Sequence, residues 1–513
     1  MRRARAGPLY LNIAVSSNSA SHQVRRGAIV NALGTVGKIS GPTFLVLVSR
    51  LYGPDVWGIY ATSYAVVQMV SALLTAGLAD GTIMYVANDV DKPDDRTGTY
   101  RSISTALFVG ISASLLVLVG LFVGGDRLLA DRFEFGDRLI LLLRWMCVGL
   151  PMMAFERIVL AATQGLGIMK YQAIVGGATR PLSLLATATA FWFFLPGELG
   201  LAVAFVVSQI VVLVTSVVFF GREFSWTELI HTMGRFRFHR GLLRFTIPQS
   251  VNATFDRFTT NVDVLMLGLL GATATMTGFY SAGALIVREL RQIKLVFSTA
   301  LSPQIARLFA DGKRDELSDV LTTTSRWIAS MAVPACIAVA IHRNDLLWIV
   351  NSAYADFDAA FVLFLLPVPY LRCSLGLAGN VVVMTGRPKI NLANGTSEGV
   401  VNVLLNLWLI PMYGLVGAAL ASSLSAVVRG GMELFEIQVL IGVRFVFGKM
   451  YAPHAAGLVS LVACTVLLLA TGLSATLTGR LTLTLAAVAI FAFTMRTISV
   501  EGGRYWPRLL RKD

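Results

Sequence analysis

Apolar segments of about 20 residues recur along the whole 513-residue chain, and this repetition limits the possible fold more than any other feature. A helix needs about 20 apolar residues to cross the hydrocarbon layer of a membrane. Hydrophobic residues make up 55% of the chain and charged residues 14%, and the mean hydropathy is +0.70, above the range of soluble globular proteins. The sequence therefore predicts an all-α integral membrane protein.

Fourteen segments have the length and apolar character of a membrane-spanning helix. Their approximate positions are 27–49, 57–87, 102–124, 139–162, 171–195, 199–220, 242–270, 276–301, 321–341, 359–384, 390–411, 414–440, 451–473 and 480–498. Lys and Arg gather in the two tails and in segment 221–241, and such residues favour the cytoplasmic side. We therefore expect both termini in the cytoplasm, and we attribute most of the net charge of +14 to topology and not to nucleic-acid binding.

The cysteines and histidines do not indicate a disulfide framework or a metal site. Cys147, Cys336, Cys373 and Cys464 fall in predicted spans without paired spacing, and the five histidines lie in tails, loops or span ends without ligand spacing. The basic N-terminal region lacks the apolar core of a cleaved signal peptide. We expect no metal and no cofactor, and we expect the first span to direct membrane insertion.

Three pairs of similar landmarks recur at an offset of about 220 residues, which indicates an internal repeat. The pairs are Arg50–Tyr60 with Leu269–Tyr280, Thr163–Lys170 with Thr385–Lys389, and Leu195–Leu201 with Ile410–Leu415. The second pair is predicted to form cytoplasmic turns. Spans one to six and seven to twelve are therefore expected to form two bundles in the same orientation.

The repeat divides the chain into six predicted regions. They are a cytoplasmic tail (1–24), an N-terminal six-helix bundle (25–220), a basic cytoplasmic linker (221–241), a C-terminal six-helix bundle (242–441), two additional transmembrane helices (442–498) and a second cytoplasmic tail (499–513).

Each predicted half carries a stripe of polar side chains on helices that are otherwise apolar enough for lipid. The first stripe comprises Asn31, Thr35, Lys38, Tyr60, Tyr64, Gln68, Ser71 and Thr75, and the second comprises Asn252, Asp256, Thr259, Thr260, Asp263, Tyr280, Arg288 and Arg291. Spacings of three and four residues place each set on one side of its helices. Two such stripes predict an aqueous cavity between the halves, as in many carriers.

The landmarks resemble those of a known family. The turn Gly53-Pro54-x-x-x-Gly58-x-Tyr60, the turn Thr385-Gly-Arg-Pro-Lys389 and the segment Ile410-Pro-Met-Tyr-Gly-Leu-Val-Gly-Ala-Ala-Leu-Ala421 are similar to the polysaccharide biosynthesis and export proteins. These are the Wzx-type lipid-linked oligosaccharide flippases of the multidrug, oligosaccharidyl-lipid and polysaccharide exporter superfamily. The resemblance covers nearly the whole chain.

The resemblance implies two six-helix bundles in a V-shaped, MATE-like arrangement around a cavity lined by spans one, two, seven and eight. It implies a transporter that flips an undecaprenyl-diphosphate-linked oligosaccharide across the bacterial cytoplasmic membrane by alternating access. A polysaccharide polymerase and export machinery, serving an exopolysaccharide or lipopolysaccharide, are the implied partners. In such a family a cationic cavity receives the diphosphate while the lipid tail stays in the bilayer.

The candidate site residues are mostly cations within predicted spans. Lys38, Arg257, Arg288, Arg291 and Lys294 are candidates for the diphosphate, Gln68 and Tyr64 for the rest of the substrate, and Asp256 and Asp263 for a coupling ion. A cation at mid-span costs about 2.5–3.5 kcal/mol on insertion scales and usually faces water or protein. Arginine suits a diphosphate because its planar fork can donate two parallel hydrogen bonds.

Structural interpretations of these charges remain open at this point. Asp256, Asp263 and Glu289 could neutralise the neighbouring arginines as ion pairs, and tyrosines such as Tyr60, Tyr64 and Tyr280 are common at membrane interfaces as well as in sugar sites. The other charges within spans are expected to pair between helices or reach the interface. They are Arg144, Glu156, Arg157, Arg180, Arg372, Glu398, Arg429, Glu433 and Glu436.

Two other functions compete with flipping. A multidrug or organic-cation antiporter of the same superfamily would need cavity carboxylates, whereas span eight has three cations and one acid. A membrane glycosyltransferase or ligase would need positioned acids or bases, and the predicted external loops are short. Gly34-Thr-Val-Gly37-Lys38 is similar to a phosphate-binding loop, but Ala32 and Ile39 occupy positions that need Gly and Ser or Thr. We therefore expect no enzyme.

Overall fold

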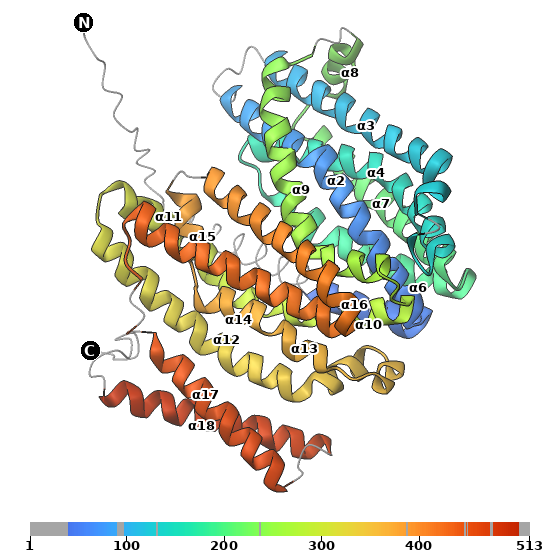
Figure 1. The fold of residues 1–513 in the computed structure, drawn as a ribbon. Coiled ribbons are helices and arrows are strands. Elements are labelled where there is room, and N and C mark those ends of the chain that lie inside the picture. The colour runs from blue at the N-terminus through green and yellow to red at the C-terminus, as the bar shows by residue number, and fades with distance from the viewer. Residues whose placement is uncertain are drawn as a thin grey trace, which may run out of the picture.

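The structure is a computed structural model that describes residues 39–89, 97–129, 132–234, 238–385, 388–445, 448, 450–471 and 476–501. Throughout this part the chain is built from helices and connecting turns, and the described residues form no strand (Figure 1). The prediction of an all-α membrane protein is confirmed.

The helices follow one another with short connections. In the first half they are Ile39–Tyr52, α2 (Pro54–Asp89), α3 (Thr97–Leu129), α4 (Gly136–Gly165), α5 (Lys170–Ile174), η2 (Val175–Thr179), α6 (Arg180–Phe194), α7 (Glu198–Gly221) and α8 (Trp226–Gly234). In the second half they are α9 (Arg240–Leu269), α10 (Ala274–Glu289), α11 (Gln292–Ala310), α12 (Arg314–Val350), η3 (Ser352–Asp356), α13 (Ala360–Leu365), α14 (Pro367–Ser374), α15 (Ala378–Met384), α16 (Pro388–Phe435), η4 (Glu436–Ile441), α17 (Tyr451–Thr471) and α18 (Leu477–Glu501).

Eight of the described helices are long and apolar enough to cross a membrane. A ninth span results if the bent pair Ala360–Ser374 and Ala378–Met384 counts as one. Of the first predicted span, only the part within helix Ile39–Tyr52 lies among the described residues. The count of fourteen spans therefore stays a prediction.

Three predicted spans are interrupted helices in the structure. The fifth contains the π-helix η2 between α5 and α6, the eighth breaks between α10 and α11, and the tenth is divided into α13, α14 and α15. Proline explains the last division in part, because Pro367 and Pro369 cannot donate the backbone hydrogen bonds of a regular helix. Irregular backbone within a membrane is tolerated where it is buried in protein or lines a cavity.

Helix α16 contains two predicted spans. Gly414, where the twelfth predicted span begins, has a φ of 54° and a ψ of −125°, so the chain turns sharply there. Glycine tolerates this conformation because it has no Cβ. The Cβ of a residue at Gly417 would lie 2.1 Å from the carbonyl oxygen of Leu409, which shows how closely the two arms approach.

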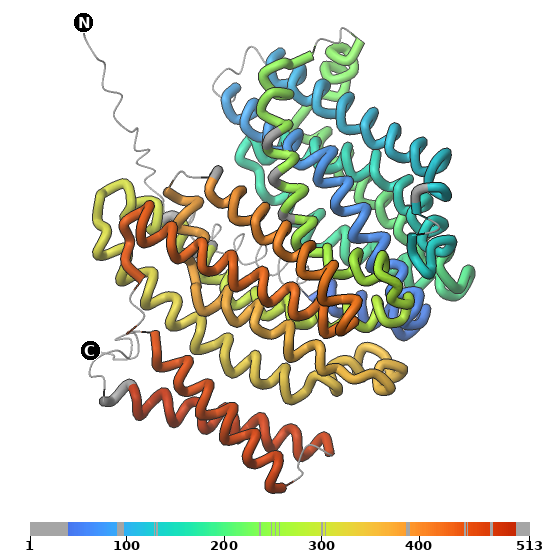
Figure 2. The backbone as a smooth tube through the Cα atoms, in the orientation of Figure 1, coloured from blue at the N-terminus to red at the C-terminus, as the bar shows by residue number. Residues whose placement is uncertain are grey.

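Helix α9 connects the two halves of the molecule. It packs along α2 on one side and against α16 on the other, while α17 and α18 form a pair beside α12 (Figure 1). The same course is visible in the backbone trace of Figure 2. At Gly77 of α2 a Cβ would lie 2.1 Å from the carbonyl oxygen of Thr246, so the two helices touch through their backbones. The predicted two-bundle arrangement is present with α2 in contact with the second half.

Candidate substrate-binding site

The break between α10 and α11 places two of the predicted arginines. The N–H groups of Leu290, Arg291 and Ile293 donate to carbonyls three residues earlier, so the helix tightens there from a four-residue to a three-residue pattern. In such a turn residues three apart eclipse one another. Arg288 and Arg291 consequently project to the same side, although the continuous helix expected for this span is not formed.

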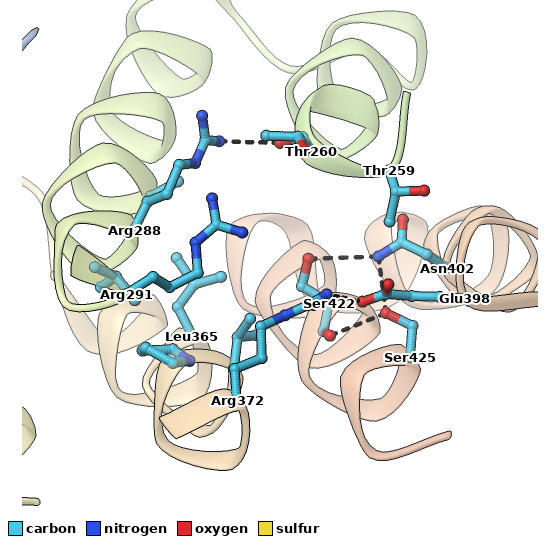
Figure 3. A pocket seen from close by; sticks show the side chains of 14 residues that line it. Thr259, Thr260, Arg288, Arg291, Leu365, Arg372, Glu398, Asn402, Ser422 and Ser425 are labelled. Atoms are coloured by element: carbon cyan, nitrogen blue, oxygen red, sulfur yellow. Dashed lines mark hydrogen bonds and ion pairs between the residues drawn. The ribbon is translucent and has the colours of Figure 1, made fainter. Parts of the chain in front are cut away.

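Arg288 and Arg291 line a cavity of about 90 Å³ in the second half, which we call the C-terminal cavity. Its polar lining comes from α9, α10, the break, α14 and α16. These residues are Thr259, Thr260, Arg288, Arg291, Arg372, Glu398, Asn402, Ser422 and Ser425 (Figure 3). Three guanidinium groups thus share the cavity with one carboxylate, so its charge is positive.

The three arginines differ in how they are held. Arg288 donates a hydrogen bond of 2.9 Å to the backbone oxygen of Thr260, and Arg372 pairs with Glu398. The side chain of Arg291 extends between them and makes no hydrogen bond or ion pair with any described residue (Figure 3). A guanidinium held away from bulk water without a partner is costly, so this arrangement favours an anion in the cavity.

Glu398 belongs to a chain of ion pairs that runs away from the cavity. Its second oxygen accepts from Arg429 at 2.9 Å, and Arg429 also donates to Glu433 at 2.9 Å. Glu398 therefore shares its negative charge between Arg372 and Arg429, and it neutralises Arg372 only in part. Pairing between helices is present for Arg372 and Glu398, whereas Arg429 and Glu433 pair within one helix at i,i+4. Arg372 also lines the cavity.

A second and larger cavity, which we call the central cavity, has a volume of about 350 Å³ and lies between the halves. One wall is aromatic, with Phe44, Trp57, Tyr60 and Tyr64, and the Tyr60 and Tyr64 rings are stacked at 5.7 Å. Arg180 and Arg288 also line it. Because Arg288 lines both cavities, they adjoin at this residue.

Six arginines from both halves lie close enough to repel one another in succession, and we call them the arginine row. Arg180 repels Arg157, Arg157 repels Arg257, Arg257 repels Arg288, Arg288 repels Arg291, and Arg291 repels Arg372. Among the described residues, four carboxylates lie near these six arginines, namely Glu156, Asp263, Glu289 and Glu398. Glu156 pairs with Arg180, and Glu398 is shared between Arg372 and Arg429. The six guanidinium groups outnumber these carboxylates, so the row keeps a positive charge that is suited to an anionic ligand.

Asp263 lies behind the C-terminal cavity in a dense hydrogen-bond network. One oxygen accepts from the Tyr280 hydroxyl at 3.0 Å and from Ser422, and the other accepts from the Asn406 amide at 3.0 Å. Asn406 also donates to the side-chain oxygen of Asn402 at 2.7 Å. The Tyr280 ring is fully buried, so it does not offer a face to a sugar.

The other predicted site residues lie in several places. Lys38 lies outside the described residues, as does the side chain of Asp256. Arg257 is exposed within the arginine row, whereas Lys294 is near Glu433 and does not line either cavity. Gln68 is buried and donates to the Tyr64 hydroxyl at 2.6 Å, so it acts on the central cavity through that tyrosine.

Arg180 and Arg372 line the cavities, although the sequence predicts only that they pair between helices or reach the interface. Each stands beside a proline-containing irregularity. Arg180 directly follows the π-helix η2 and precedes Pro181, and Arg372 lies in α14, which begins Pro367-Val-Pro369. A cation next to such a break is a usable signal, because π-helical turns are frequent at functional sites.

No group of three or more His, Cys, Asp or Glu side chains in the described part of the chain could hold a metal ion.

Residues 24–309 match the family described as "Polysaccharide biosynthesis protein". The chain belongs to this family. A curated relative, the probable low-salt glycan biosynthesis flippase Agl15 of Haloferax volcanii, is 20% identical over 215 residues. The match covers 42% of this chain and 45% of the relative, so the chain spans about half the length of the curated relative it matches.

Solved structures show the same fold. The lipid II flippase MurJ in an inward closed conformation aligns with a TM-score of 0.68 at 12% identity, over 93% of this chain and all of that one. A multidrug resistance MATE family transporter in an inward-facing conformation aligns with a TM-score of 0.65 at 14% identity, over 80% of this chain and 94% of that one. The predicted MATE-like architecture is therefore confirmed.

Proposed function

We propose that this member of the family flips an undecaprenyl-diphosphate-linked oligosaccharide across the cytoplasmic membrane by alternating access. The observation that carries the proposal is Arg291, which stands without a partner among the described residues, between Arg288 and Arg372 in a cavity with a single carboxylate. Two phosphate groups match this array, because each can accept parallel hydrogen bonds from a guanidinium fork.

Each of the two cavities binds a chemically different part of the substrate. The diphosphate binds in the C-terminal cavity and at Arg288, and the sugars extend into the central cavity along Tyr60, Tyr64 and Trp57. Aromatic rings of this kind bury large contact areas and can leave a polar tip free for hydrogen bonds. Gln68 fixes the hydroxyl of Tyr64. The lipid tail stays in the bilayer.

Three other predicted cations remain part of the proposal with smaller roles. Arg257 adds positive potential from its exposed position in the arginine row, and Lys294 does so from behind the C-terminal cavity. Lys38 is proposed as a further contact from the first span.

The family match and the flippase name of the archaeal relative support transport and not an enzymatic reaction. The MATE transporters of the same fold make an organic-cation antiporter the alternative. The sign of the charge favours the flippase, because a cavity with three arginines and one glutamate repels an organic cation.

We propose Asp263 as the site of a coupling ion, with Asp256 as a second candidate. Asp263 accepts hydrogen bonds from the Asn406 amide and the Ser422 hydroxyl, and the Asn406 side-chain oxygen is buried without a hydrogen-bond partner among the described residues. The carboxylate, the hydroxyl and this amide oxygen are the oxygen atoms of the proposed site. Oxygen donors of this kind suit a hard monovalent cation or a proton on the carboxylate. The network also contacts the cavity through Ser422.

The apolar helices establish a multi-pass membrane protein. We propose a bacterial cytoplasmic membrane with both termini in the cytoplasm, supported by the basic tails and linker. A polysaccharide polymerase and export machinery are the proposed partners.

The experiment is a flipping assay with purified protein in vesicles that contain a fluorescent lipid-linked oligosaccharide. The wild type should move the lipid, and Arg291→Ala should slow it at least about tenfold, because hydrogen bonds between charged groups contribute about 1.5–3 kcal/mol. Arg307→Ala, in the exposed part of α11, is the matched control.

The alternatives give distinct results in the same vesicles. Normal flipping by Arg291→Ala would contradict the proposal that the C-terminal cavity binds the diphosphate. Movement of a cationic dye without movement of the lipid would support the antiporter. Sugar transfer by the purified protein alone would support an enzyme.

A further inference from the structure

Among the described residues, each half of the protein has a buried ion pair between two helices, and these two pairs stand at equivalent positions of the repeat. In the first half Glu156 of α4 pairs with Arg180 of α6, and in the second half Arg372 of α14 pairs with Glu398 of α16. Glu156 and Arg372 are 216 residues apart, and Arg180 and Glu398 are 218 residues apart. The two pairs thus correspond, but their charges are exchanged between the helices.

The exchange of charges leaves one property the same in both halves. The glutamate side chains are almost completely buried, at 3% and 4% exposure, whereas the arginine side chains are 26% and 24% exposed. Arg180 lines the central cavity and Arg372 lines the C-terminal cavity. In each half the guanidinium is therefore the more accessible partner and lines a cavity, whichever helix carries which charge. Glu156 lines neither cavity, and Glu398 lines the C-terminal cavity beside Arg372 with only 4% of its side chain exposed.

A pair that only joined two helices would not need this constant orientation. The local backbone supports a second role, because each arginine sits at an irregular segment. Arg180 follows the π-helix Val175–Thr179, and Arg372 lies just before the break between Ser374 and Ala378, where the span bends by 51°. Such segments change the direction of a side chain from that of a regular helix. Both arginines also stand at the two ends of the arginine row.

We propose that Arg180 and Arg372 are two additional contacts for the substrate's anionic diphosphate, one from each half, and that Glu156 and Glu398 position them. This inference rests on the proposed function and adds a route for the diphosphate between the two cavities. Arg180 provides an anion-binding site in the central cavity, and Arg372 provides one in the C-terminal cavity. Arg288 lines both cavities and lies between these two sites.

The test uses an exchange of charges within the first half. The double variant Glu156→Arg/Arg180→Glu can keep an ion pair between α4 and α6 but moves the cation away from the cavity. A second exchange, Asp126→Arg/Arg144→Asp, serves as the matched control, because this pair also joins two helices of the first half and lines neither cavity.

We expect the double variant to have a melting temperature close to that of the wild type and to flip lipid-linked oligosaccharide at least tenfold more slowly. The control exchange should change neither property. A double variant that flips at the wild-type rate would show that the pair is only structural and would overturn the inference. A wild type that fails to flip the lipid would instead remove the proposed function.

Single variants keep the inference testable if the exchanged pair does not fold. Arg180→Lys and Arg372→Lys retain the charge, whereas Arg180→Gln and Arg372→Gln remove it. We expect farnesyl diphosphate to raise the melting temperature of the wild type and of both lysine variants, and to do so less in both glutamine variants. For Glu156→Gln we expect a higher KM with little change in kcat, as for a positioning residue. Equal protection of the glutamine variants and the wild type would contradict the inference.

Discussion

Gly58 of α2 and Gly278 of α10 pack against each other through their backbones. A Cβ at Gly58 would lie 1.9 Å from the carbonyl oxygen of Ala274, and a Cβ at Gly278 would lie 2.4 Å from that of Pro54. The two glycines occupy the same place in the repeated landmarks, 220 residues apart. Two equivalent residues can contact each other in this way only near the axis that relates the halves.

Gly58→Ala should therefore prevent the two halves from closing at this end. The neighbouring atoms are backbone atoms and cannot rotate away, so we expect a loss of about 1–3 kcal/mol in the free energy of unfolding, together with slower flipping. Thermal unfolding and the vesicle assay measure both effects. Gly120→Ala in α3, where a Cβ would meet no atom within 4 Å, is the control and should leave both unchanged.

Arg291→Met should stabilise the protein while abolishing its function. The side chain has no partner in the described structure, and methionine has a similar length without the charge. Replacing a buried ionic group with a well-packed apolar one often stabilises a protein, here by about 1–2 kcal/mol. A melting temperature below that of the wild type would mean that Arg291 has a structural partner.

Asp263→Ala and Asp263→Asn should separate two roles of the same residue. Alanine leaves Tyr280, Asn406 and Ser422 without their acceptor, so we expect a loss of about 3 kcal/mol in stability. Asparagine preserves most of the hydrogen bonds but removes the charge. We expect this variant to fold normally and to flip the lipid without the dependence on a Na⁺ or proton gradient that the wild type shows.

Cross-linking α2 to α9 should arrest the transport cycle. Near the predicted cytoplasmic end, Gln249 donates to Asp80 at 2.9 Å, and Ser250 accepts from the backbone of Gly77 at 3.1 Å. In Asp80→Cys/Gln249→Cys a short bifunctional thiol reagent should join the helices and stop flipping. All four native cysteines are buried, so each single-cysteine variant reports any unspecific effect of the reagent.

Arg480→Ala should loosen α18 without removing transport. Its guanidinium makes two hydrogen bonds to Asp345 of α12, at 2.8 and 2.6 Å, and His342 contacts both Asp345 and Thr484. Because this pair is only partly exposed, we expect a loss of about 2 kcal/mol in stability. Arg480→Lys should recover part of it. If Arg480→Ala lowered the flipping rate as much as Arg291→Ala does, α18 would belong to the substrate-binding site.

Sequence reasoning located most helices because apolar length and turn residues are local properties. The boundary between the eleventh and twelfth predicted spans lies at Gly414, where the backbone does turn. The break between α10 and α11 was not foreseen, since Leu290 and Arg291 include neither glycine nor proline. At this break the Cys373 thiol donates to the Leu290 carbonyl oxygen at 3.9 Å, and a contact so distant in the sequence leaves no local pattern.

In the candidate site, too, the sequence predicts what depends on local spacing and misses what depends on contacts between helices. The spacing of Arg288 and Arg291 identified two residues that line one cavity, although Lys294 lies outside it. The partners of Arg180 and Arg372 come from other helices, so a search along single helices could not tell which member of each pair is the more accessible one.

The exchanged charges of the two buried pairs also restrict how the halves could have diverged or could be recombined. If α4 and α14 traded places in a chimaera, Arg372 would face Arg180 and Glu156 would face Glu398. Like charges would then meet in the interior of both bundles. The halves are compatible as whole bundles but not helix by helix, so a viable chimaera must move both members of a pair together.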